Sequence, residues 1–359
     1  MKSLIRISIA LLAVCGILFY AIHSLSQSSG VSGKKVLTVY NWGEYIDPAL
    51  LKKFEKETGI HVVYETFDSN EAMMTKIEQG GTNYDIAVPS EYTIEQMKEK
   101  NLLLPVNHKD IPNLKNIDED FLDLPFDPKN QYSIPYFWGT VGIVYNPKLL
   151  GDKYKFERWD DLWDPSLKGK VVLVDSAREV LGMGLNSMGK SLNSTDPKEL
   201  SAATDKLIKM GPNVKAIIGD EVTQLMINED AMVALTWSGQ AADMMYENED
   251  LTYTVPSEGS NLWFDNMVIP KTSKNVEGAH KFINFMLEPE NAAQNADYVG
   301  YSTPNKAALS LLDEEVVNDE RYYPSKETRE NLHVYKNLGL EKIGEYNELF
   351  LKFKMAINE

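Results

Sequence analysis

The sequence has little of what most enzymes and metalloproteins use. Its one cysteine, Cys15, lies near the N-terminus, so the rest of the chain has no thiol nucleophile and no disulfide. The histidines are scattered without the spacing of metal ligands, at positions 23, 61, 108, 280 and 333. There is no P-loop, no Rossmann glycine fingerprint and no local Ser-His-Asp set. These absences favour a binding protein over an enzyme, and we expect no cofactor.

Basic residues are also scarce. The 359 residues include 36 Lys and Arg against 53 Asp and Glu, which gives a net charge of −17. Binding to nucleic acid depends on cationic contacts, so nucleic acid is not expected as a partner. An acidic surface favours cationic ligands, although it is also a common solubility feature. The apolar content of 43% is that of a globular protein, and the length predicts two lobes.

The first 33 residues differ from everything that follows. Lys2 and Arg6 precede an almost unbroken apolar run over residues 7–22, a pattern typical of a signal peptide or of an uncleaved N-terminal anchor. Residues 12–15, LAVC, resemble a bacterial lipidation motif, although a smaller residue is usual before the cysteine. Polar and small residues at 24–33 predict a flexible tether. We therefore expect export to the periplasm or to the outer face of the cytoplasmic membrane, with an N-terminal anchor or lipid on Cys15.

Short apolar strands alternate with helices along the rest of the chain, which predicts parallel sheets with right-handed crossovers. The first unit is a strand at 36–40 and a helix over Pro48–Thr58, with Asp47 as its N-cap. Further strands are expected at 61–64, 85–88, 171–174, 214–218, 232–236 and 251–255. Further helices are expected near 70–79, 91–100, 176–188, 197–210, 222–227, 238–246, 276–287, 289–296, 304–312 and from 325 to the end.

Two extended segments are predicted to connect the lobes. Residues 105–135 contain five prolines and are expected to be irregular. The strand at 139–145 that follows would cross into a second lobe, and residues 260–270 would cross back. We therefore predict an α/β protein of two lobes, the first formed by 34–141 with 264–309 and the second by 142–263 with 310–359.

Aromatic and acidic residues gather where these elements end. Ligands of open α/β sheets bind beyond the carboxyl ends of the strands. Aromatic faces attract ammonium groups, and carboxylates form strong charge-assisted hydrogen bonds with them. A linear polyamine needs both, since it alternates methylene chains with ammonium groups. The candidates are Trp42, Tyr45, Tyr92, Glu179, Trp237, Trp263, Asp265 and Tyr301.

The polar candidates each have a structural alternative. Ser176 and Glu179 have the spacing of a capping box, in which the glutamate bonds the backbone at a helix start. Asp265 could be a structural hydrogen-bond acceptor in a crossing segment. Ser90, which precedes a helix, is most simply an N-cap.

The rings and the overall function also leave alternatives open. Trp42 and Tyr45 could simply cover the top of a sheet, and Trp237 could belong to the core. A sugar-binding lipoprotein would use the same aromatic walls. A hydrolase could use Glu179 and Asp265 as its carboxylate pair. Binding of iron by tyrosines lacks an adjacent tyrosine pair with His or acid partners.

Six segments resemble the polyamine (spermidine/putrescine) substrate-binding proteins of ABC importers: YNWGEY (40–45), YDIAVPS (84–90), YSIPYFWG (132–139), AREV (177–180), WFD (263–265) and GYSTPN (300–305). They span nearly the whole chain after residue 36. The resemblance implies a type II periplasmic-binding-protein-like fold with the ligand in a cleft between two α/β lobes. It also implies a monomer that delivers spermidine or putrescine to an ABC permease with a cytoplasmic ATPase.

The resemblance further assigns roles to individual residues. Glu179 and Asp265 match positions that hold a ligand amino group. Ser90 matches a polar contact, and Glu44 matches a position that reaches the other end of the ligand, directly or through water. The aromatic walls correspond to Trp42, Tyr45, Tyr92, Trp237, Trp263 and Tyr301.

Several positions depart from the family pattern. Ser176 stands where an aspartate can serve the inner amine, and Tyr335 where a glutamine can occur. Gly43 and Gly219 replace hydroxyl residues. These departures leave the choice among putrescine, spermidine and spermine open.

Overall fold

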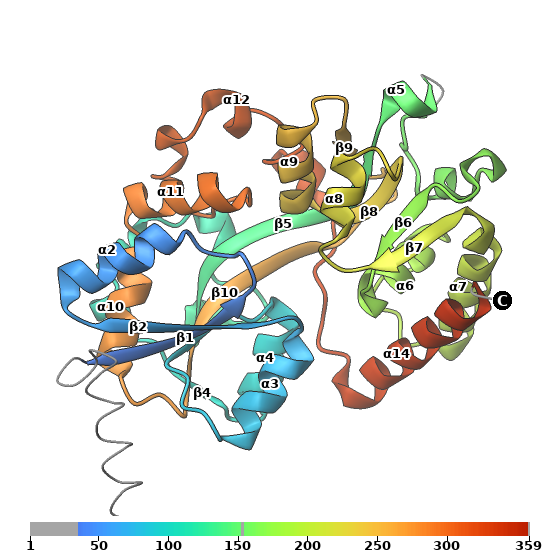
Figure 1. Cartoon of the computed structure of the whole chain (residues 1–359). Helices are drawn as coiled ribbons and strands as arrows, with labels where there is room; N and C mark the ends of the chain where they lie inside the picture. Colours follow the sequence, from blue (N-terminus) through green and yellow to red (C-terminus); the bar gives the residue numbers. More distant parts are fainter. Residues whose placement is uncertain (1–34, 152–153, 358–359) are drawn as a thin grey trace, which may run out of the picture.

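A computed structural model describes residues 35–151 and 154–357, so the predicted signal or anchor segment, the tether and Cys15 lie outside the described residues. Ten strands form one sheet in the order β2-β1-β3-β10-β5-β8-β6-β7, with β4 paired to β10 and β9 paired to β5 (Figure 1). The strands are β1 Val36–Trp42, β2 His61–Phe67, β3 Ile86–Ala87, β4 Leu103–Leu104, β5 Ser133–Tyr145, β6 Val171–Val174, β7 Val214–Ile218, β8 Val233–Trp237, β9 Thr252–Thr254 and β10 Leu262–Pro270.

Helices cover both halves of this sheet (Figure 1). They are α2 Pro48–Thr58, α3 Asn70–Gln79, α4 Glu91–Glu99, α5 Pro147–Leu150, α6 Ala177–Asn186, α7 Pro197–Met210, α8 Val222–Ile227, α9 Ser238–Glu247, α10 Val276–Met286, α11 Pro289–Val299, α12 Glu314–Val317, α13 Lys326–Glu330 and α14 Gly339–Ala356. Among residues 35–151 and 154–357, no helix is long and apolar enough to cross a membrane.

The sheet has two halves, one around β1, β2 and β3 and the other around β6, β7 and β8. The strands of each group are parallel, as the alternating pattern predicts. In the first half, β1 pairs in parallel with β2 and β3. In the second half, β6 pairs in parallel with β7 and β8. The predicted cap of α2 is also present, because the Asp47 side chain accepts a hydrogen bond from the backbone N–H of Ala49.

Two long antiparallel strands join the halves. β5 has thirteen residues, all buried, and pairs first with β10 and then with β8 and β9. It begins at Ser133, inside the segment that we expected to be irregular. Pro135 fits this strand because it lies opposite Asn266, next to a register shift in β10, where a missing N–H is tolerated.

A third connection runs beside β10. The backbone N–H of Leu262 donates to the carbonyl of His333 at 3.0 Å, and the N–H of His333 donates to Ser260 at 2.8 Å. The chain then passes between the halves to α14 (Figure 1), which packs on α6 and α7. The division into lobes at residues 141, 263 and 309 stays a prediction.

Two helix predictions are wrong in part. Over residues 304–312 the structure has turns and only a short 3₁₀ helix, Leu309–Leu311. The Asn305 side chain accepts the backbone N–H groups of Ala307 and Ala308, a local turn that competes with a helix. The helix expected from residue 325 is interrupted between α13 and α14, because this stretch pairs with the chain before β10.

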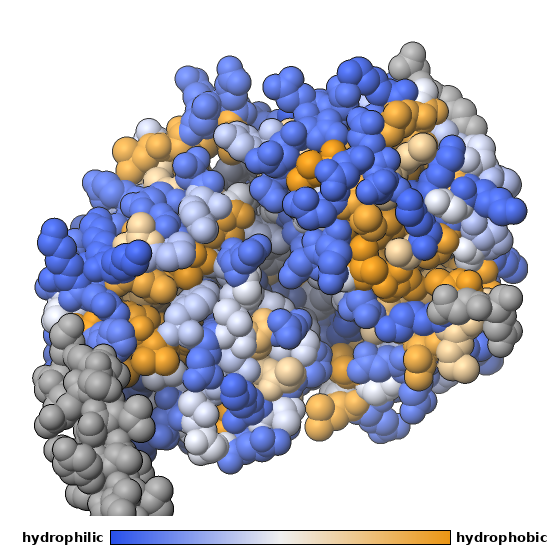
Figure 2. Space-filling model, viewed as in Figure 1, coloured by the Kyte–Doolittle hydropathy of each residue, from blue (hydrophilic) through white to orange (hydrophobic). Residues whose placement is uncertain are grey.

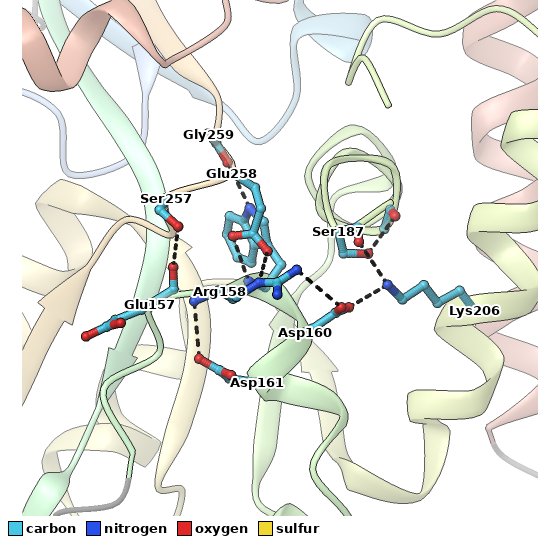
Figure 3. A network of polar contacts seen from close by, with 11 residues as sticks. Glu157, Arg158, Asp160, Asp161, Ser187, Lys206, Ser257, Glu258 and Gly259 are labelled. Atoms are coloured by element: carbon cyan, nitrogen blue, oxygen red, sulfur yellow. Dashed lines mark hydrogen bonds and ion pairs between the residues drawn. The ribbon is translucent and has the colours of Figure 1, made fainter. Parts of the chain in front are cut away.

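The chain before β10 is also anchored by a polar network. Trp159, which is 1% exposed, donates its indole N–H to the carbonyl of Gly259 at 2.8 Å. Arg158 pairs with Glu258 at 3.2 Å, and Lys206 of α7 donates to the carbonyl of Ser187 at 3.0 Å (Figure 3). The Trp159 and Arg158 contacts fix the turn at Glu258 and Gly259, from which the chain enters β10.

Candidate functional site

Three polar and aromatic side chains lie on one face of β10 and of the residue before it. Asn261, Trp263 and Asp265 are alternate residues, so their side chains share a face at a spacing of about 6.6 Å per pair. All three are buried. β10 runs between the two halves (Figure 1), where the surface has a hollow bordered largely by hydrophilic residues (Figure 2).

Asp265 is held by hydroxyl groups from two distant segments. Tyr45 donates to Oδ2 at 2.8 Å and Ser90 donates to Oδ1 at 2.6 Å. The amide of Asn70 lies 3.0 Å from both the Ser90 hydroxyl and the Tyr92 hydroxyl. Ser90 is the N-cap residue of α4, but its side chain makes no capping bond. The structure thus brings three predicted residues, Tyr45, Ser90 and Tyr92, together near the carboxylate of a fourth, Asp265.

Glu179 lies in a second polar cluster. Its Oε1 accepts the Asn261 amide at 3.0 Å, and its Oε2 lies 2.9 Å from the Tyr335 hydroxyl. That hydroxyl also lies 2.8 Å from the carbonyl of Arg178. The capping box is not formed, since Ser176 makes no side-chain capping bond at the start of α6.

Aromatic rings connect the two clusters. Tyr301 makes edge-to-face contacts with Tyr45 and with Trp263, each with ring centroids 5.3 Å apart. Tyr92 and Tyr335 meet at right angles with centroids 6.3 Å apart. These contacts place aromatic surface next to both carboxylates.

Trp237 lies at the end of β8 and is half-buried. Its side chain is one of the hydrogen-bonding groups that lower the pKa of Glu179. A role in the site and partial packing in the core are therefore both compatible with its position.

Two predicted residues stand apart from these clusters. The Trp42 indole N–H donates to the carbonyl of Val88 at 3.0 Å, and the ring centroids of Trp42 and Phe67 lie 4.5 Å apart. These contacts agree with the alternative that Trp42 covers the top of the sheet. Glu44 is exposed. The pKa of Asp243 on α9 is raised mostly by burial, and the charge of Glu44 adds to this increase. A ligand contact by Trp42 or Glu44 stays a prediction.

Burial controls the charge of both candidate carboxylates. It raises the pKa of Asp265 to about 6, against the hydrogen bonds from Ser90 and Tyr45. It raises the pKa of Glu179 to about 7, against the hydrogen bonds from Tyr335 and Asn261 and the charge of Arg178. Both groups therefore change charge near neutral pH, and a bound cation would favour their ionised forms.

Three residues of this region were not predicted as site residues. Asn70 directly follows Ser69, the N-cap of α3, and an asparagine at a helix start is most simply read as part of the cap. Asn261 could have been found from the alternation with Trp263 and Asp265. Glu91, at the first position of α4, is fully buried and accepts the backbone N–H of Phe264 at 2.9 Å. An acid at a helix start indicates only a favourable interaction with the helix dipole.

The clusters are distinct from the large open depression on the second half. That depression has a volume of 1410 Å³ and includes Trp163, Asp160 and Lys206, but none of the predicted site residues. Within the described residues, no group of three His, Cys, Asp or Glu side chains could hold a metal ion.

Known proteins resemble this chain over most of its length. The family of bacterial extracellular solute-binding proteins matches residues 49–323. The spermidine/putrescine-binding periplasmic protein of Escherichia coli is 41% identical over 320 residues, which cover 89% of this chain and 91% of that protein.

Two solved structures share the fold. A putative spermidine/putrescine ABC transporter protein from Listeria monocytogenes superposes with a TM-score of 0.86 and 62% identity, over 90% of this chain and 99% of its own. The spermidine/putrescine ABC transporter substrate-binding protein of Streptococcus pneumoniae superposes with a TM-score of 0.81 and 56% identity, over 90% and 100%.

Proposed function

The chain belongs to the family of bacterial extracellular solute-binding proteins, and from this premise we propose that it captures spermidine or putrescine for an ABC importer. Family membership confirms the prediction of a binding protein rather than an enzyme, and the two-lobed periplasmic-binding-protein-like fold is that of the solved relatives. The observation that carries the proposed ligand is the buried Asp265 carboxylate, held by Tyr45 and Ser90 beside aromatic rings.

The two acids and the rings match the chemistry of a linear polyamine. Asp265 and Glu179 are each only 6–7% exposed, so a bound ammonium group would pair with them away from bulk water, where such pairs are strong. Their hydrogen-bond partners fix the orientation of the oxygens. Trp263 and Tyr301 offer aromatic surface to the methylene chain and to the charges.

Capture requires the two halves to close on the ligand. The crossing strands and the segment at 331–337 are the natural hinge elements, since domain closure is absorbed by a few connecting residues. A ligand drives closure only through contacts that it makes in the closed state. A polyamine that bridges Asp265 of the first half and Glu179 of the second half supplies such contacts.

The remaining parts of the proposal concern location and partners. The protein acts in the periplasm or at the outer face of the cytoplasmic membrane, held by its N-terminal segment or by lipid on Cys15. It acts as a monomer and delivers the ligand to the membrane permease of an ABC importer, whose ATPase is cytoplasmic. The basic apolar N-terminus supports export, and the names of the relatives support the transporter context.

Calorimetric titration of the region from residue 33 onward tests the ligand. Ligand-free protein is titrated with putrescine, spermidine, spermine and maltose. The proposal expects one-to-one binding of at least one polyamine, weaker at high salt, and no binding of maltose. Salt-insensitive binding of maltose would favour a sugar-binding protein instead. Absence of heat with every polyamine, from a folded sample, would refute the proposal.

A further inference from the structure

A third buried carboxyl group lies next to the Asp265 cluster. Glu91 follows Ser90 in the chain and has no exposed surface. Its Oε2 accepts the backbone N–H of Phe264, the residue before Asp265, at 2.9 Å. Its Oε1 is buried and has no hydrogen-bond partner within the part of the chain that the structure describes. The Ser90–Asp265 bridge and the Glu91–Phe264 bond thus hold Glu91 against the backbone of β10 next to Asp265.

The surroundings of Glu91 oppose its negative charge. Burial, together with the weaker effect of the charges of Asp265 on β10 and Glu179 on α6, raises its pKa to about 8, against the hydrogen bonds from the backbone N–H groups of Phe264 and of Glu91 itself. The Tyr92 hydroxyl on the same helix also interacts with it.

Other charged groups lie one step away, around Tyr92. Arg178 of α6 lies 5.7 Å from the Tyr92 ring, and burial, followed by the charge of Glu71 on α3, raises the pKa of the Tyr92 hydroxyl. The burial of Glu91 thus favours its protonated form at neutral pH, and its Oε1 has no hydrogen-bond partner among the described residues.

We propose that Glu91 is a third charged group of the ligand site, which releases its proton to solvent when the ammonium groups of a polyamine enter between Asp265 and Glu179. The proposal rests on the proposed function. The O–H bond of the carboxylic acid breaks, the proton passes to water or buffer, and the carboxylate that remains faces the bound cation. A nearby positive charge favours the ionised form of a carboxyl group, and the cation offsets the repulsion from the other two acids. The site then carries up to three negative charges.

Proton release on binding measures this step directly. We suggest titrating spermidine into wild type, Glu91→Gln and Glu290→Gln at pH 7, in buffers with different heats of ionisation. Gln at position 91 keeps the acceptor for Phe264 and mimics the protonated acid. Glu290 is exposed at the start of α11 and controls for the loss of one carboxylate. We expect wild type and Glu290→Gln to release protons equally, and Glu91→Gln to release up to about one fewer.

The pH dependence of affinity gives a second readout. Spermidine affinity of the wild type should rise between pH 6 and pH 9 more steeply than that of Glu91→Gln. The two proteins should agree within about threefold at pH 6 and differ by about tenfold or more at pH 9, because only the wild type gains a carboxylate. Equal proton release and parallel pH profiles would overturn the proposal.

Two further observations keep the outcome unambiguous. If Glu91→Gln fails to fold, carbon-13 NMR of the Glu91 carboxyl in wild-type protein is used instead. Its pKa must fall on addition of spermidine, and an unchanged value overturns the proposal. If folded wild type binds no polyamine, the proposed function fails and this inference fails with it. Binding with unchanged proton release in the variant refutes only the role of Glu91.

Discussion

The hydroxyl of Tyr45 lies 2.8 Å from Oδ2 of Asp265, although the two residues are 220 positions apart in the chain. Tyr45 belongs to the loop after β1, and Asp265 to the strand that runs between the halves. Ser90 occupies the other oxygen of the same carboxylate. Two hydroxyl groups thus fix the orientation of the acid, and a group held in this way needs less ordering when it binds a ligand.

Replacing Asp265 by Asn tests this acid. The amide has almost the same shape but no charge, and its NH₂ group would face a hydroxyl donor. We expect spermidine affinity to fall by about 2–5 kcal/mol, since removing one partner of a buried charge pair leaves the other unpaired. Calorimetry measures the loss. Asp297→Asn, at an exposed position of α11, should bind like wild type. Wild-type affinity in folded Asp265→Asn would rule out the assignment.

Tyr335→Phe tests how the second acid is tuned. The Tyr335 hydroxyl lowers the pKa of Glu179, so its removal raises that pKa and leaves fewer molecules with an ionised Glu179 at lower pH. We expect spermidine affinity to fall by about threefold at pH 8 and about tenfold at pH 6. Calorimetry at both pH values measures this difference.

Tyr346→Phe is the matched control for Tyr335→Phe. The rings of Tyr335 and Tyr346 both lie next to the Arg178 guanidinium, with centroids 4.0 Å and 5.2 Å from its Cζ. The Tyr346 hydroxyl, however, bonds the carbonyl of Ser194 rather than Glu179. Its loss should reduce stability by about 1 kcal/mol and leave affinity unchanged. An equal loss of affinity at both pH values in Tyr335→Phe would mean that this tyrosine acts only through packing.

Gly239→Ala tests the aromatic wall without changing any charge. A methyl group on Gly239 would collide with the ring of Tyr301 and would displace it from Trp263 and Tyr45. We expect about a tenfold loss of spermidine affinity, comparable to the loss of one aromatic contact. In Gly344→Ala of α14 the new methyl group meets nothing within 4 Å, so this variant should bind normally and gain about 0.5–1 kcal/mol of stability. Normal binding by Gly239→Ala would remove Tyr301 from the site.

Local signals in the sequence were sufficient for much of the fold. Asp47 followed by Pro48 marks the start of α2, and Gly59 and Gly80 end α2 and α3 in left-handed conformations. The apolar runs locate most strands. The helix expected at 304–312 failed because the Asn305 side chain bonds the following backbone, a choice that composition does not reveal.

The sequence was sufficient to predict which residues belong to the site, but not which of them bond to one another. Residue type and position at strand ends pointed to Tyr45, Ser90 and Asp265, yet their hydrogen bonds depend on how distant strands are registered. Asn261 and Glu91 went unnoticed because amides and acids are usually exposed. Their burial follows from the packing of α4 and α6 against the strand between the halves, which is a tertiary property.

The stability of ligand-free protein should fall as pH rises from 5 to 8. The pKa of Glu91 is near 4.5 when unfolded and about 8 in the folded protein. The folded state therefore binds more protons between these values, so the contribution of Glu91 to stability is complete below pH 4.5 and is lost by about pH 8. The maximal slope from one such group is about 1.4 kcal/mol per pH unit.

Glu91→Gln removes the contribution of this titrating group. Urea unfolding at pH 5, 6, 7 and 8 should therefore show a free energy of unfolding that declines less steeply with pH than in wild type. Saturating spermidine should reduce the difference, because the bound cation stabilises the ionised acid. Parallel stability curves for the two proteins would show that Glu91 does not titrate in this range.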